Sequence, residues 1–175
     1  KVMLPFYLRE DYMQVMVLSA SAGIMEGDVQ KFDIHVNPGT SLEYLSQAYE
    51  KIHRMKEGMA RRETKIVVEP EAFLKYAPLP TIPFRDSAFE NHLEIELKEK
   101  TSRLLFQEIL SCGRAACGEA FAYRLYHNHV AVREEGNLIY LDNTRYDPEF
   151  FEMSGMGMYE GFTHFLNLVF FNIEK

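Results

Sequence analysis

The stretch KFDIHVNPGTSLEYL, residues 31–45, contains the pattern that decides the fold. Phe32, Ile34 and Val36 alternate with polar residues, which is the period of two expected for a strand with one face in water. Pro38-Gly39 then supplies a turn, because proline fixes φ and glycine accepts the left-handed backbone. A second apolar segment follows at once, so the stretch predicts a strand, a tight turn and another strand.

This unit recurs along the chain at a nearly constant offset. Each turn is followed by a leucine and, two positions later, by an aromatic residue; Leu42 and Leu74 are 32 positions apart, and Leu74 and Leu104 are 30 apart. The repeated features are the turns Pro38-Gly39, Pro70-Glu71 and Lys100-Thr101, the leucines Leu42, Leu74 and Leu104, and the aromatic residues Tyr44, Tyr76 and Phe106. A period in this range is typical of stacked, solenoid-like architectures.

Further strands are indicated on both sides of this repeat. Residues 92–97 alternate like residues 31–36, and both segments are interpreted as half-buried antiparallel strands. More continuous apolar runs at 13–18, 66–68, 104–110 and 165–171 indicate more buried strands. The expected fold is therefore mainly β, with stacked antiparallel strands in a two-layer or solenoid-like arrangement and few short helices. Residues 142–161 are expected to form a long loop.

One segment conflicts with the repeat. Ser41 is a suitable helix cap, the apolar residues of 42–52 also follow a helical stripe, and Gly58 stands where a helix would end. Periodicity alone therefore predicts a helix over 42–57. The repeat instead predicts a strand followed by a turn at 56–58, and we adopt the strand because the repeat explains three segments at once.

Size, composition and charge restrict the function. A chain of 175 residues that is 47% hydrophobic is expected to form one domain, residues 1–175, around one core. Its net charge of -7 argues against a nucleic-acid partner. The apolar runs are too short for a membrane helix, and the two cysteines are expected to be reduced thiols in the cytoplasm. No leader peptide is recognisable, although a chain that starts inside a patterned region can lack its true beginning.

Motifs of common enzymes do not occur in the sequence. It contains no phosphate-binding loop, no His-Glu-x-x-His pair and no Gly-x-Ser-x-Gly elbow, so we do not expect an enzyme. Two clusters combine glycine with charge. In SAGIMEGD, Asp28 follows a glycine and either caps a turn or has a further role. In CGRAACGEAF, Arg114 and Glu119 need partners in an apolar context and are expected to pair with each other or with Asp28.

Several side chains are candidate metal ligands. His127 and His129 are two residues apart, which places both on one face of a strand, but no third ligand is close in the sequence. A structural surface role explains them equally well. Cys112 with Cys117, and the methionines 153, 156 and 158, are alternatively ligands for a soft ion or ordinary packing residues. None of these sets is a strong cage, so no tightly bound cofactor is expected.

Four segments in order resemble the UreD (UreH) family of urease accessory proteins: SAGIMEGD, SQAYEKIH, FLKYAPLPTIPF and CGRAACGEAF. The resemblance covers nearly the whole chain, and the later segments YLDNTRYDP and YEGFTHFLNLVFF are similar to the Helicobacter-type branch. Leu45 and Cys117 depart from the family pattern, which puts local polar contacts in doubt. Because the family extends further at both ends, this chain is expected to be an internal portion of a longer one.

The resemblance implies a cytoplasmic adaptor that binds apo-urease and UreF, and through UreF the GTPase UreG, so that nickel reaches urease. It further implies an internal polar passage, for which Asp28 and Glu119 are the expected sites of transient nickel contact. Two other functions stay open. One is a hydrolase that uses Asp28 and Glu119 as an acid–base pair in an open pocket. The other is a β-solenoid protein-binding module without a metal role.

Overall fold

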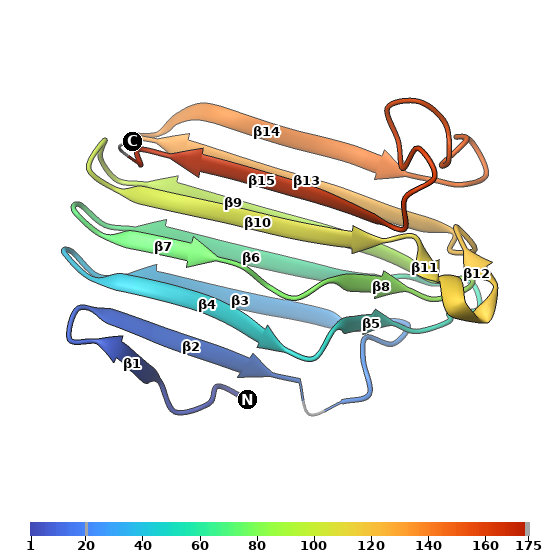
Figure 1. The fold of residues 1–175 in the computed structure, drawn as a ribbon, viewed down its shortest axis with the longest axis horizontal. Helices are drawn as coiled ribbons and strands as arrows, with labels where there is room; N and C mark the ends of the chain where they lie inside the picture. Colours follow the sequence, from blue (N-terminus) through green and yellow to red (C-terminus); the bar gives the residue numbers. More distant parts are fainter. Residues whose placement is uncertain (20, 174–175) are drawn as a thin grey trace.

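The computed structural model describes residues 1–19 and 21–173, and it consists of two sheets stacked face to face (Figure 1). Sheet A contains β1 (Phe6–Arg9), β2 (Tyr12–Leu18), β4 (Ser41–Gln47), β5 (Glu50–Ile52), β7 (Phe73–Tyr76), β8 (Thr81–Pro83), β10 (Arg103–Ser111) and β15 (His164–Phe171). Sheet B contains β3 (Val29–Val36), β6 (Ala60–Val68), β9 (Ala88–Leu97), β13 (Leu125–Glu134) and β14 (Asn137–Tyr146). A small hairpin of β11 (Gly113–Arg114) and β12 (Glu119–Ala120) flanks the 3-10 helix η1 (Ala115–Cys117).

The strands coil between the two sheets, and most neighbours within a sheet are parallel. Strands β3, β6, β9 and β13 pair in parallel in sheet B, as do β2, β4, β7 and β10 in sheet A. The expected mainly β, solenoid-like fold is confirmed, but the antiparallel pairing of its central strands was wrong. Each tight turn carries the chain across to the opposite sheet, so the next strand in the same sheet arrives one coil later and runs in the same direction. Antiparallel pairs occur at the ends, between β1 and β2, β13 and β14, and β10 and β15.

The sequence repeat corresponds to the register in which successive strands of sheet A pair. Leu42 pairs with Leu74 and Leu74 with Leu104, while Tyr44 pairs with Tyr76 and Tyr76 with Phe106. Identical positions of successive coils are therefore stacked on one another. The rings follow the same order, with centroids 4.8 Å apart between Tyr44 and Tyr76 and 6.0 Å apart between Tyr76 and Phe106.

The segment for which helix and strand competed forms strands β4 and β5, as the repeat predicted. A bend follows at 56–57, and the carboxylate of Glu26 organises it by accepting hydrogen bonds from the amides of Lys56, at 2.8 Å, and Gly58, at 2.6 Å. Charge-assisted bonds of this kind satisfy amides that neither sheet can pair. The long loop begins later than expected, because β14 continues to Tyr146.

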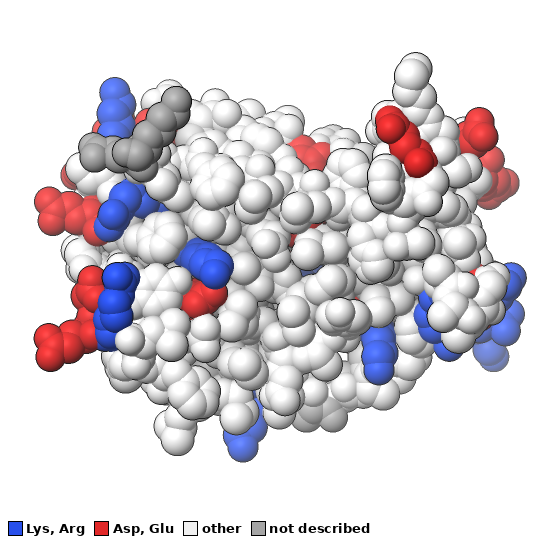
Figure 2. Space-filling view, viewed as in Figure 1, with Lys and Arg blue, Asp and Glu red and all other residues white. Residues whose placement is uncertain are grey.

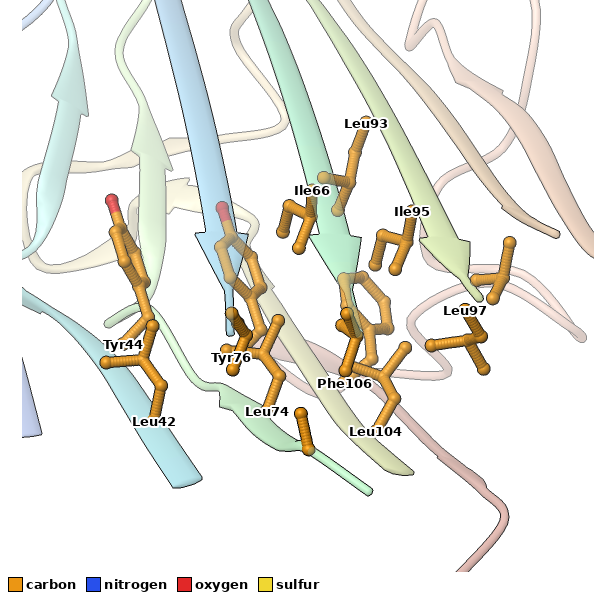
Figure 3. Close-up of a cluster of buried hydrophobic side chains, with 14 of the residues drawn as sticks. Leu42, Tyr44, Ile66, Leu74, Tyr76, Leu93, Ile95, Leu97, Leu104 and Phe106 are labelled. Carbon is orange, nitrogen blue, oxygen red and sulfur yellow. The ribbon is translucent and has the colours of Figure 1, made fainter. Parts of the chain in front are cut away.

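The interior holds two apolar clusters. The larger lies where sheet A presents Leu42, Leu74 and Leu104 to Ile66 and Ile95 of sheet B (Figure 3). The second lies near the other end of the strands and contains Ile24, Ile52, Met55, Ala60, Phe89, Leu110, Cys112, Tyr123, Tyr126, Tyr146, Met153 and Tyr159. Burial of these side chains at roughly 25 cal/mol per Å² is the main force that holds the two sheets together.

The outer face of sheet A is poor in charge over much of its area. Figure 2 shows this face, on which acidic and basic side chains gather mainly toward the two ends. At its β15 edge Leu166, Leu168 and Phe170 are 54%, 43% and 54% exposed. Adjacent exposed apolar side chains on an edge strand are typical of a surface that binds another protein. No helix in the described residues is long and apolar enough to cross a membrane.

Candidate functional site

A row of polar side chains crosses the interior between the two apolar clusters. Gln30 of β3 pairs in register with Arg62 of β6, Arg62 with Asn91 of β9, and Asn91 with Asn128 of β13. The row ends at β14, where Thr144 is opposite Asn128. We call this row, together with Glu50, Glu108, Asp142 and Asn167, which approach it from neighbouring strands, the polar band.

The polar band faces inward because of the strand period. On β9, Leu93, Ile95 and Leu97 are buried in the larger cluster, and Asn91 lies on the same face two residues earlier. The other strands of sheet B repeat this arrangement at the equivalent position. Since successive coils are in register, one polar residue per coil is enough to build a continuous line of donors and acceptors.

Arg62 is the cation of the polar band. Its side chain is only 13% exposed and forms an ion pair with Glu50, which is 20% exposed. The guanidinium also donates to the Gln30 side-chain oxygen from Nε at 3.1 Å and from Nη2 at 2.7 Å. A charge withdrawn from water this far is stable only when it is paired and hydrogen-bonded, and Glu50 with Gln30 meets both needs.

Glu108 and Asp142 form the acidic end of the polar band. The Asn128 amide donates to Glu108 at 2.6 Å and to Asp142 at 3.0 Å, so one nitrogen joins the two carboxylates. The Asn91 amide donates to Glu108 at 3.2 Å. Burial, reinforced by the nearby charge of Asp142, raises the pKa of Glu108 to about 7. Near neutral pH this carboxyl is therefore only partly ionised.

Both ends of the polar band meet a cavity. At the end formed by the first coils, a cavity of about 580 Å³ is lined by Gln30, Tyr44, Glu50 and Arg62 among others. At the end formed by β10, β13, β14 and β15, a small opening of about 10 Å³ is lined by Glu108, Asn128, Asp142 and Asn167 among others. The polar band thus lies between a wide cavity and a small acidic pocket that has room for about one water molecule.

The two predicted metal contacts, Asp28 and Glu119, lie outside the linings of both cavities. Asp28 closes the turn at the start of β3, where its carboxylate accepts the Met25 amide at 2.8 Å. Glu119 binds Arg114 through two hydrogen bonds of 2.8 and 2.7 Å, as expected for one of the two pairings considered. Arg114, with help from Arg85, lowers the pKa of Glu119. No hydrogen bond or ion pair within residues 1–19 and 21–173 joins Asp28 to Glu119.

The other candidate ligands are dispersed. Cys112 is buried and Cys117 is exposed, and both are free thiols. Met153 is buried in the second apolar cluster, whereas Met156 is 96% exposed. His127 and His129 share the outer face of sheet B, where His92 of the neighbouring strand lies beside them. As the side chains stand, no three His, Cys, Asp or Glu donors converge as a metal site in the described part of the chain.

Comparison with known proteins identifies the family of the chain. A sequence model of the family described as "UreD urease accessory protein" matches residues 1–174. The chain belongs to the UreD family. Urease accessory protein UreH of Helicobacter pylori (strain HPAG1) is 41% identical over 172 residues, which cover 98% of this chain and 64% of the relative. Urease accessory protein UreD of Acetivibrio thermocellus is also 41% identical over 172 residues, covering 98% of this chain and 65% of the relative.

A more distant UreD-family relative extends the same picture. Urease accessory protein UreD of Actinobacillus pleuropneumoniae serotype 5b is 30% identical over 164 residues, covering 93% of this chain and 60% of that protein. The chain therefore spans slightly less than two thirds of the length of these relatives. The predicted membership in the family is confirmed by these matches.

Sequence analysis did not single out the polar band. A signal was present, because Gln30 precedes Phe32, and Asn91 precedes Leu93, by two positions in the two strands with the clearest alternation. A polar inward residue two positions before the buried apolar run of each strand indicates a polar layer when the strands are in register. That register could be recognised only once the pairing of the sheet B strands was known.

Proposed function

We propose that the chain is the β-solenoid part of a non-catalytic adaptor in urease maturation. In this proposal the adaptor binds apo-urease and UreF in the cytoplasm, recruits the GTPase UreG through UreF, and lets nickel pass to urease. Membership in the family supports the link to urease, and the absence of a phosphate-binding loop from the sequence supports the need for a separate GTPase. The apolar edge formed by Leu166, Leu168 and Phe170 supports a role in binding another protein.

The observation that carries the proposal is the polar band between two cavities. A divalent ion that moves through a protein needs water and oxygen ligands in place of its hydration shell, and it must bind weakly enough to leave. The carboxylates of Glu108 and Asp142, with the amide oxygen of Asn128, provide such ligands at the narrow end. Because the pKa of Glu108 is about 7, an arriving cation can displace its proton instead of requiring a permanent negative charge.

The role of Asp28 and Glu119 as transient nickel contacts remains a prediction. Arg114 and Arg85 offset the charge of Glu119, which weakens it as a ligand unless these arginines move away. The geometry therefore favours Glu108 and Asp142 as the principal ligands. Replacing Asp28 and Glu119 by alanine tests the original expectation, because unchanged urease activation and complex assembly would reject it.

The proposed function is tested in the full-length protein co-expressed with UreF, UreG and apo-urease. Size-exclusion chromatography reports assembly, and urease activity after nickel addition reports insertion. We expect the double substitution Glu108→Gln and Asp142→Asn to leave the complex assembled and to reduce activation at least tenfold. Glu94→Gln serves as the control, because Glu94 is exposed on the outer face of β9. Full activation by the double variant would reject the passage, and failure of the wild type to bind UreF would reject the adaptor.

The two alternative functions are less well supported. A hydrolase with Asp28 and Glu119 as its acid–base pair needs one carboxyl with a raised pKa, whereas the pKa of Glu119 is lowered by Arg114. A protein-binding solenoid without a metal role agrees with the apolar edge of β15. It does not explain why a continuous polar row is kept inside the sandwich, where apolar side chains would pack at lower cost.

A further inference from the structure

Three histidines lie together on the outer face of sheet B, on the opposite side of the sheet from the interior polar band. His127 and His129 are two residues apart on β13, and His92 is the register partner of His129 on the parallel strand β9. Alternate residues of a strand share one face, so all three imidazoles project from the same side of the sheet. Sequence analysis paired His127 with His129 but found no third ligand; the parallel pairing of β9 with β13 supplies one.

The rings are close enough to share a ligand. The ring centroids of His92 and His129 are 5.3 Å apart with an interplanar angle of 24°, and those of His92 and His127 are 6.1 Å apart. Two imidazoles on one strand and a third on its neighbour thus lie side by side on the sheet, within reach of one ion after a change of ring orientation. A depression of about 210 Å³, lined on one side by His92, adjoins the cluster and gives access from solvent.

The hydrogen bonding of the cluster is incomplete. The Nδ1 atom of His129 is buried and has no hydrogen-bond partner, which is costly for a polar atom. Within the described residues, no hydrogen bond holds the ring of His92. His127 is the exception, since its Nε2 atom lies 2.8 Å from the Asn143 side-chain oxygen and its Nδ1 atom lies 3.9 Å from a Glu90 oxygen. Outer contacts of this kind orient metal-binding imidazoles in proteins.

We propose that His92, His127 and His129 form a surface site for a late first-row divalent transition-metal ion such as Ni²⁺ or Zn²⁺. Imidazole nitrogen is a preferred ligand for these ions, and three histidines with an open fourth position are an established donor set. Hard ions such as Mg²⁺ prefer oxygen and are not expected to bind here. This site is independent of the interior passage and of the adaptor function.

Ion binding requires the rings to turn, because the donors do not converge as they stand. The ring of His92 can rotate without breaking any hydrogen bond of the described residues. Rotation of the His129 ring would allow its unpaired Nδ1 atom to bind the ion. Glu63 and Glu90 are register neighbours of His92 and His127 and bring negative charge to the cluster. Lys31 and Arg61 pair with these carboxylates and so keep them at the rim as supporting charges, not as ligands.

The test is titration calorimetry of the metal-free full-length protein with NiCl₂, ZnCl₂ and MgCl₂. We expect the wild type to bind Ni²⁺ and Zn²⁺ but not Mg²⁺, and His92→Gln and His129→Gln each to weaken binding at least tenfold. His35→Gln is the matched control, because His35 lies on the same outer face but pairs with Glu69 at 2.7 Å. Circular dichroism establishes that each variant is folded.

Two further measurements separate this site from the interior. Glu108→Gln removes a proposed interior ligand and is expected to retain the calorimetric binding step that His92→Gln and His129→Gln lose. In nuclear magnetic resonance spectra, substoichiometric Ni²⁺ is expected to broaden the ring signals of the three histidines and not those of His35. The proposal is overturned if the wild type binds neither ion, if His92→Gln and His129→Gln bind as the wild type does, or if only Glu108→Gln loses binding.

Discussion

Replacing Glu108 by glutamine should stabilise the protein above neutral pH. The unfolded chain ionises this carboxyl near pH 4.5, whereas burial and the charge of Asp142 delay its ionisation in the folded protein to about 7. Between these values the folded state holds a proton that the unfolded state has lost, so stability falls as pH rises. The full difference corresponds to roughly 3 kcal/mol, and the partial exposure of Glu108 reduces the expected effect to about 1–3 kcal/mol.

Glutamine preserves the shape of the site while removing the titration. Its oxygen can accept the Asn128 amide, which is 2.6 Å from the Glu108 carboxylate. Urea unfolding from pH 4 to pH 8.5 gives the free energy of unfolding of both proteins. We expect the two curves to be nearly parallel below pH 4.5, to diverge as pH rises, and to differ most above pH 7.

Glu94→Gln provides the comparison, since Glu94 lies on the same sheet but is exposed. It should leave the pH dependence of the free energy of unfolding unchanged. If Glu108→Gln lowered stability at pH 8, or if its curve ran parallel to that of the wild type across the whole range, Glu108 would not be a buried carboxyl with a raised pKa. The proton displacement proposed for ion passage would then lose its basis.

Three further substitutions test the packing around the site by urea unfolding. Phe106→Ala empties a fully buried position between the sheets and should cost about 3–5 kcal/mol; a loss below 1 kcal/mol would contradict the stacked interior. Arg62→Met leaves Glu50 without its partner and should cost about 3 kcal/mol, whereas also changing Glu50 to Gln should restore most of the loss. Gly113→Ala should cost roughly 2–4 kcal/mol, because φ is +116° and a Cβ would collide with the Glu119 carbonyl oxygen; Gly118→Ala, with open space around it, should cost about 1 kcal/mol.

The candidate sites show where inference from the sequence stops. Asp28 and Glu119 stood out because charge beside glycine is conspicuous in a sequence, yet the structure gives them local partners in a turn and in a hairpin. Asn91 and Asn128 were not noticed, because a single asparagine in a strand has no distinctive neighbours. Their amides are joined at 2.9 Å by the pairing of β9 with β13, two strands that are far apart in the chain.

The sequence by itself determined the strand period, the turn residues and the repeat of leucine and aromatic positions, because alternation and backbone preference are local properties. It also determined the family, through four characteristic segments that occur in order. Only the tertiary structure decided that successive coils are parallel and in register. That arrangement brings Arg62, Asn91 and Asn128 into one row inside the protein and His92 beside His129 outside it, since contacts between coils depend on which strands become neighbours.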